Sequence, residues 1–178
     1  MKTALTYGFI MALGSSFVSL AFFFTGYHDE AAKLQSAQSI TIALSVAISL
    51  TCIVLAMREK RELTPGDANW GYGSALGTGV MVGLFGAILS SVYSYAYFTF
   101  INPHMVDLAL QVQLDKMSES GMSANQIDQV EPTMRKWMNP VVMTISSMVM
   151  IFITNFVIAL IAAIFVKNRP ASLPAAQP

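Results

Sequence analysis

The sequence predicts an all-α fold, an integral membrane bundle of four transmembrane helices with a helical extracytoplasmic hairpin between helices 3 and 4. Two observations lead to this fold. The 178 residues are 54% hydrophobic and only 11% charged, whereas about 25% of the residues of a soluble domain are charged. The charges are also clustered, because no Asp, Glu, Lys, Arg or His occurs within residues 3–27, 34–57, 68–103 and 137–166.

Each of these four runs is long enough to cross a membrane as a helix. About 20 apolar residues span the hydrocarbon layer, where only helices or closed barrels satisfy every backbone group. The runs do not alternate as barrel strands do, and the first exceeds the apolar core of a signal peptide. We therefore expect one membrane domain over residues 1–169 and a disordered Pro/Ala-rich tail over 170–178. The expected spans cover about residues 4–26, 38–57, 73–100 and 140–166.

The segment between the third and fourth spans, about residues 102–138, is too long for a plain connector. Asn102 precedes Pro103, a pattern typical of a helix start, and Gly121 is a plausible stop. Ser123 and Gln126 then have the spacing of a capping box. We expect two short helices that either roof their own bundle or dock another protein.

The distribution of Lys and Arg predicts the orientation of the chain. Basic residues in short loops favour the cytoplasmic side of a membrane, and four spans divide them six to four. The larger group predicts that both termini are cytoplasmic. It contains Lys2, Arg58, Lys60, Arg61, Lys167 and Arg169, and the smaller group contains Lys33, Lys116, Arg135 and Lys136.

The third span contains a row of small residues spaced four apart: Ala75, Gly79, Gly83, Ala87 and Ser91. Residues with this spacing share one face of a helix, and small side chains let two helices approach closely in lipid. We expect this face to pack against another helix. The candidates are helix 2 or helix 1 of the same chain, a second copy in a homo-oligomer, or another membrane protein.

The spans contain no ionisable side chain apart from the lone thiol of Cys52 and the tyrosines, which argues against proton-coupled transport. The most polar residue within a span is Asn155, for which an interhelical hydrogen bond is the simplest role. The alternative is a polar contact for a translocated molecule, shared with Ser45 and Ser49. The sequence has no phosphate-binding loop, no Ser/His/Asp pattern and no basic face for nucleic acid.

The two histidines, His28 and His104, fall on the same side of the predicted bundle. With a carboxylate, two imidazoles can hold zinc and leave one position open. Their spacing in the sequence is not local, however, and histidine is also an ordinary residue at a membrane surface. We therefore expect no metal site and no other cofactor, and keep His28 and His104 as the only candidates for one.

The order of several short segments resembles a bacterial membrane family catalogued as domain of unknown function 4199. These segments are "MREKREL" before a Gly turn, the Gly-rich third span, "YFTFINP", "GMSANQID" and a last span that begins with Pro and ends in Lys. The resemblance covers about residues 4–169 and implies a four-span topology in a bacterial inner membrane. It implies no activity and no catalytic residue.

The function expected from these patterns is that of a non-catalytic accessory or scaffold protein of the inner membrane, packing through its third helix. An alternative is a transporter or channel-like subunit for a lipid or a small apolar molecule. That alternative requires a cavity lined by Ser45, Ser49, Asn155 and the tyrosines around Tyr95. A further alternative is a metal-dependent enzyme that uses His28 and His104.

Overall fold

The computed structural model describes residues 1–65 and 70–168. All regular structure in this part of the chain is helical, as the sequence predicts. The last helix begins cleanly because the Asn139 side chain accepts hydrogen bonds from the N–H groups of Val141 and Val142, with Pro140 at the first position. The elements are α1 (Lys2–Phe24), α2 (Ala31–Glu62), α3 (Tyr72–Ala96), the π-helix η1 (Tyr97–Ile101), α4 (Met105–Glu119), α5 (Ala124–Trp137) and α6 (Pro140–Val166).

Four helices have the length and hydropathy to cross a membrane: α1, α2, α3 with η1, and α6. This result confirms the predicted number of spans. The second helix is longer than its predicted span of 38–57, because α2 has 32 residues. The additional turns are polar and continue the helix with good helix formers such as Lys and Glu. Arg169 and the tail expected to be disordered, 170–178, lie outside the described residues.

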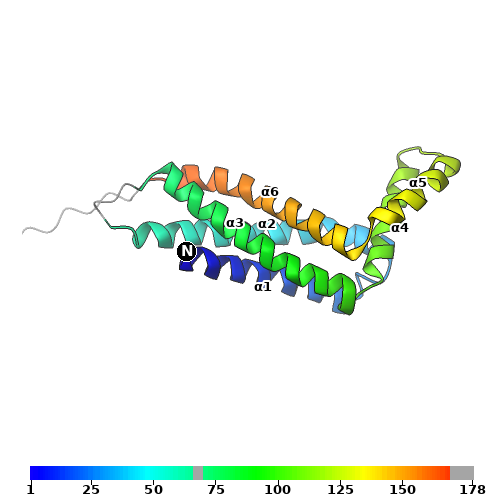
Figure 1. Ribbon diagram of the computed structural model, residues 1–178, viewed down its shortest axis with the longest axis horizontal. Coiled ribbons are helices and arrows are strands. Elements are labelled where there is room, and N and C mark those ends of the chain that lie inside the picture. Colours follow the sequence, from blue (N-terminus) through cyan, green and yellow to red (C-terminus); the bar gives the residue numbers. More distant parts are fainter. Residues whose placement is uncertain (66–69, 169–178) are drawn as a thin grey trace, which may run out of the picture.

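The four long helices lie side by side, and α4 and α5 extend beyond one end of the bundle (Figure 1). Within the bundle, α3 is the central element, because it contacts α6, α1 and α2. We call the part of the bundle near Lys2, Tyr72 and Val166 the termini half. The part near Phe24, Ala31 and Pro140 is the α4 half.

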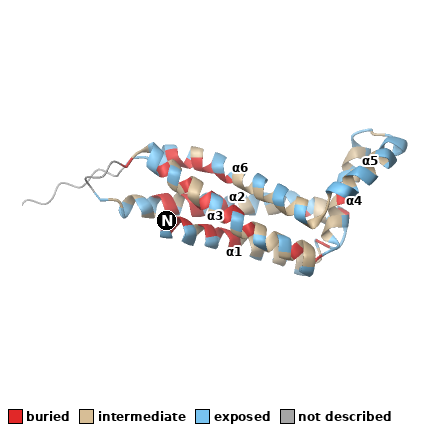
Figure 2. Cartoon of the chain, viewed as in Figure 1, coloured by how far each residue is buried: buried red, intermediate tan, exposed pale blue. Residues whose placement is uncertain are grey.

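The connected hydrophobic core lies in the termini half (Figure 2). There, Ile53, Met57, Val82 and Ala159 are fully buried between α2, α3 and α6. In the α4 half, by contrast, no helical residue is buried within 13–24, 38–48, 91–96 or 140–154. The helices therefore pack tightly at one end and loosely at the other.

The small residues of α3 explain the tight packing. A Cβ atom added at Gly79 would lie 2.4 Å from Cε of Met57 and 2.9 Å from Cβ of Ala159, and one added at Gly83 would lie 2.8 Å from Cβ of Asn155. The helix that occupies the Gly83 face is thus α6. Gly79 meets α2 as well as α6, so helix 2, which the sequence names as a candidate, does contact the row. The sequence does not name α6, because the spacing of small residues marks a face but does not choose its neighbour.

The remaining members of the row differ in exposure. Ala75 and Ala87 are buried with Gly79 and Gly83, whereas Ser91 is partly exposed and its hydroxyl donates to the carbonyl of Ile88. Ser91 lies in the α4 half, where the helices no longer meet closely. The row therefore serves contacts within the chain over most of its length.

The segment between α3 and α6 forms two helices that contact each other and differ in their contacts with the bundle. α4 lies against α2 and buries Leu110 and Val112, whereas α5 has no buried residue. The capping box of Ser123 and Gln126 is present, and Gly121 has the left-handed φ of +89° that suits a helix stop. Asn102 does not cap α4, which begins at Met105, because its side chain turns into the bundle instead.

Candidate functional site: a pocket between α2, α3 and α4

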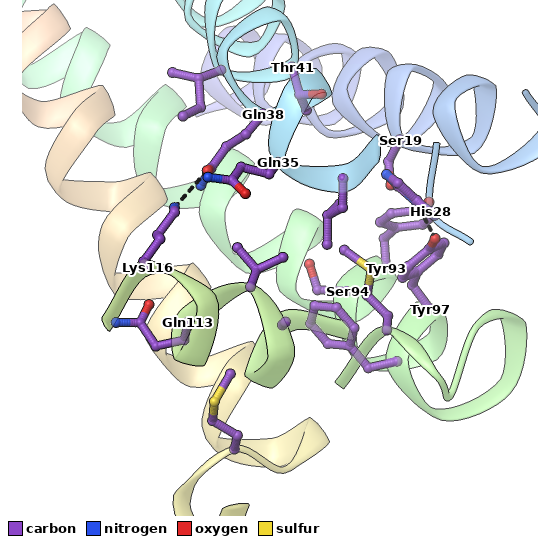
Figure 3. A pocket seen from close by; sticks show the side chains of 17 residues that line it. Ser19, His28, Gln35, Gln38, Thr41, Tyr93, Ser94, Tyr97, Gln113 and Lys116 are labelled. Carbon is purple, nitrogen blue, oxygen red and sulfur yellow. Dashed lines mark hydrogen bonds between the residues drawn. The ribbon is translucent and has the colours of Figure 1, made fainter. Parts of the chain in front are cut away.

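A pocket of 440 Å³ lies in the α4 half, where α4 crosses the ends of α2 and α3 (Figure 3). Both α2 and α4 contribute polar and apolar side chains to its walls. The volume falls in the range of about 300–1,000 Å³ that holds small-molecule ligands. The lining residues are Ser19, His28, Leu34, Gln35, Gln38, Thr41, Ile42, Tyr93, Ser94, Tyr97, Phe98, Met105, Ala109, Val112, Gln113, Lys116 and Met138.

One side of the pocket carries three amide side chains and a single cation. Gln35 and Gln38 come from the first turns of α2, and Gln113 and Lys116 come from α4. Lys116 Nζ donates a hydrogen bond of 3.0 Å to Oε1 of Gln38, which ties α4 to α2 (Figure 3). No Asp or Glu is among the lining residues. This side therefore presents N–H donors and one positive charge.

The opposite side is closed by a buried cluster of His28, Tyr97 and Asn102, with exposed fractions of 6%, 3% and 7%. The Tyr97 hydroxyl hydrogen-bonds Nδ1 of His28, and Nδ2 of Asn102 approaches the same hydroxyl at 3.3 Å. The amide can only donate to this oxygen. The phenol proton is then used in the bond to His28 when the imidazole is the tautomer protonated at Nε2.

Burial also favours the neutral form of His28. Loss of solvent lowers the pKa of the imidazole below its ordinary value of 6.5, and this effect exceeds the opposing attraction of Asp29. His28 lies outside the spanning helices, in the link between α1 and α2, and its ring is held by the hydrogen bond to Tyr97. His28 thus adds no positive charge to the pocket at neutral pH.

The π-helix at the end of α3 places Tyr97 in this cluster. Over Tyr97–Ile101 the backbone widens, and the N–H of Asn102 bonds the carbonyl of Tyr97 at 2.8 Å. A π-turn shifts the register of the side chains that follow it, and such turns are frequent at functional sites. Here the shift brings Asn102 back over Tyr97, so that both side chains face His28.

The remaining walls are apolar and come from α2, η1, α4 and the link between α5 and α6. They include Leu34, Ile42, Phe98, Val112 and Met138. The nearby hydroxyl of Tyr93 is buried and has only the side chain of Ser19 close to it. The pocket is thus amphipathic, with amides and a cation on one side, a buried polar cluster on the opposite side and apolar side chains between them.

The sequence of the chain matches the model of a known protein family. The model of the family described as "Protein of unknown function (DUF4199)" matches residues 6–168. The chain belongs to this family. Neither the curated proteins nor the solved structures gave a match for this DUF4199 chain. Membership therefore agrees with the resemblance seen in the sequence and assigns no activity to the pocket.

The polar residues predicted within the spans of this DUF4199 protein do not line the pocket. Asn155 is 1% exposed and packs in the core, where its Nδ2 lies 3.5 Å from Sδ of Met11. Ser49 is buried on α2, and Ser45 is partly exposed. Of the residues expected to line a cavity, these three do not, whereas Tyr93 and Tyr97, on either side of Tyr95, do line the pocket nearer the end of the bundle. Gly83 lets α6 close against α3 at Asn155 instead.

The two histidines line a second pocket of 350 Å³ together with Asp29 and Asp107. Within residues 1–65 and 70–168, no group of three His, Cys, Asp or Glu side chains has an arrangement that could hold a metal ion. Nδ1 of His28 is already bonded to Tyr97. The pair therefore shares a pocket wall without forming a ligand set.

Sequence reasoning missed the amides and the lysine of the main pocket. Gln35 and Gln38 are three residues apart, as are Gln113 and Lys116, so each pair shares one helix face. This spacing indicates that each of the two helices has a polar face, which could contact another polar surface. The sequence does not reveal that the two faces meet, because α2 and α4 are separated by the whole of α3.

Proposed function

We propose that the protein is a non-catalytic accessory protein of a membrane that binds a lipid or another small amphipathic molecule in the pocket of the α4 half. The observation that carries this proposal is the pocket itself, with donors on one wall and apolar side chains on the others. It lies at the end of four helices that have the properties of membrane spans. At that depth a lipid headgroup and the start of its chain occur together.

The packed termini half favours binding over conduction. Met57, Val82, Ala159 and Asn155 fill the interior between α2, α3 and α6. A molecule held in the α4 half therefore meets a dense core of side chains on its way to the other end, since interiors of this kind leave few voids. The same packing occupies Gly79 and Gly83, so we assign the accessory role to the α4 half rather than to the small-residue row.

The proposal is tested by filling the pocket. We expect the wild-type protein, extracted in a mild non-ionic detergent, to carry an amphipathic molecule that native mass spectrometry detects. Ala109→Phe places a ring within the pocket wall, whereas Ala43→Phe adds the same ring on an exposed position of α2. The bound molecule should be lost in the first variant and kept in the second. Equal occupancy in the two variants, or an empty wild-type protein, would contradict the proposal.

We further propose that the membrane is a bacterial inner membrane and that both termini are cytoplasmic. Lys2, Arg58, Lys60, Arg61 and Lys167 lie at the termini end of the bundle, and a majority of basic residues favours the cytoplasm. This orientation puts the pocket, α4 and α5 on the outer side.

Labelling of single cysteines tests the orientation, because the only native cysteine, Cys52, is buried. A membrane-impermeant thiol reagent added to intact cells should label Asn125→Cys on α5. It should label Glu62→Cys at the end of α2 only after the cells are opened. The reverse pattern would place the termini outside.

A further inference from the structure

We infer that the occupant of the pocket is an amphiphile with a singly charged anionic headgroup, a carboxylate or a phosphodiester, and that Lys116 is the charge that binds it. This inference rests on the proposed function and specifies its ligand. The headgroup would lie among Gln35, Gln38, Gln113 and Lys116, with its chain along the apolar walls.

The charges around the pocket favour an anion. Among the described residues that line the pocket, Lys116 is the only charged one, since His28 is held neutral by its hydrogen bond and its burial. None of the ion pairs formed by the described residues involves Lys116, because they join Lys33 to Glu30 and Arg135 to Asp107 and Glu131. A cation in a partly enclosed site without a carboxylate partner attracts one negative charge.

The hydrogen-bonding groups that line the pocket also favour an anion. An ammonium group has three donors and no acceptor, and Lys116 uses one of them on Oε1 of Gln38. The same bond occupies the acceptor oxygen of Gln38 and leaves its amide N–H groups for a ligand. Gln35 and Gln113 add further N–H donors to this wall (Figure 3). An oxyanion needs several donors converging on it, and charge-assisted hydrogen bonds are the stronger kind.

The apolar walls suit a single hydrocarbon chain. Leu34 and Ile42 lie on either side of the amides along α2, and Val112 of α4 and Met138, directly after α5, line the same pocket. Residues 34–57 carry no charged group, so this wall continues into the membrane-spanning part of α2. A chain that starts at Lys116 would therefore run toward the hydrocarbon layer.

Binding of three single-chain probes to the full-length protein in neutral detergent tests the inference. Oleate carries a carboxylate, oleoyl lysophosphatidylglycerol carries a phosphodiester, and monoolein has a similar chain without a charge. We expect at least one anionic probe to bind with saturation and monoolein to bind at least tenfold more weakly. The tighter of the two anions identifies the headgroup class.

Variants of two lysines provide the control. Lys116→Gln should weaken the anionic probe about tenfold to a hundredfold, as expected for loss of a charged hydrogen bond. Lys116→Arg should keep most of the affinity. Lys136→Gln removes the same charge from the exposed end of α5, away from the pocket lining, and should leave binding unchanged.

The outcomes separate this inference from the proposed function. If all three probes bind equally well and Ala109→Phe abolishes binding, the pocket is a lipid site without preference for an anion, and the inference about Lys116 is wrong. The same conclusion follows if Lys116→Gln and Lys136→Gln bind alike. If no probe binds and the pocket of the wild-type protein is empty, the proposed function fails as well.

Discussion

In the termini half, α3 meets its neighbours through Gly79 and Gly83, whereas in the α4 half it presents Tyr93 and Tyr97. The two glycines bring α6 close enough for Ala159 to be fully buried. The tyrosines hold the helices apart and surround a pocket. The size of the side chains along α3 and η1 thus changes where the packed core gives way to the pocket.

The same change occurs along α6. Its second half buries Ala159, Ala162 and Ala163, whereas no residue within 140–154 is buried. Small side chains favour close contact between helices in lipid, where apolar surface alone gives little driving force for association. We infer from this comparison that the close contacts that stabilise the bundle are concentrated in the termini half. The α4 half, with fewer buried residues in its helices, should tolerate side-chain substitutions more easily.

The largest expected effect comes from overfilling the packed half. Gly79→Leu places a side chain against Met57 and Ala159, so α3 and α6 must separate, and we expect a loss of about 3 kcal/mol or more, the upper part of the range for overpacking. The melting temperature in detergent measures this effect. The control is Gly77→Leu on the same helix, where nothing lies within 4 Å of an added Cβ. Equal melting temperatures would show that the core does not depend on close approach at Gly79.

A smaller effect is expected at the closed wall of the pocket. Tyr97→Phe removes the hydroxyl that links His28 and Asn102, and leaving buried polar groups without a partner costs about 1–3 kcal/mol. Tyr95→Phe removes a hydroxyl from a tyrosine that is 45% exposed and should be neutral. Thermal unfolding of both variants makes the comparison. If Tyr97→Phe is as stable as the wild type, the cluster contributes nothing to the α4 half.

The α4 half should also respond to pH. Because the pKa of His28 is lowered in the folded protein, the unfolded chain binds more protons below about pH 6.5, and stability falls as the pH drops through this window. We expect the melting temperature to decrease between about pH 7 and 5. His28→Gln should reduce this decrease, whereas His104→Gln, at an exposed position, should retain it. A slope that is unchanged in His28→Gln would exclude His28 as its source.

The smallest effect is expected outside the bundle. Arg135 joins α5 to Asp107 of α4 at 3.0 Å, but both side chains are more than half exposed. Exposed ion pairs contribute about 0–1 kcal/mol, so Arg135→Gln should shift the melting temperature of the bundle little. A large shift would show that α5 supports the spans, contrary to the absence of buried residues in α5.

The four spans were predictable because the charge-free runs report directly on the requirements of a membrane. The small-residue face of α3 was predictable for a similar reason, since the spacing of four fixes a helix face. The identity of its neighbour was not, because Asn155 and Ala159 carry no sequence mark that pairs them with Gly83 and Gly79.

The pocket was less accessible to sequence reasoning. His28 was noticed as a rare residue, but its partner Tyr97 depends on a π-turn for which no sequence rule was applied. From the sequence, Lys116 contributes only to the predicted orientation of the chain in the membrane. Its role as the single cation of a pocket depends on α4 lying across α2, which is a matter of tertiary structure.

The hydrogen bond between Lys116 and Gln38 has a mechanical consequence. It holds α4 on α2, and α4 in turn carries α5, which contacts it outside the bundle. An anion bound by the remaining donors of Lys116 and by the amide N–H groups of Gln38, as proposed above, would join the two helices further and favour this position of α4. Linkage is reciprocal, so a protein that grips α5 and displaces α4 changes the affinity for the anion by the same factor. One lysine would thereby couple the proposed occupant of the pocket to the position of α4 and of α5.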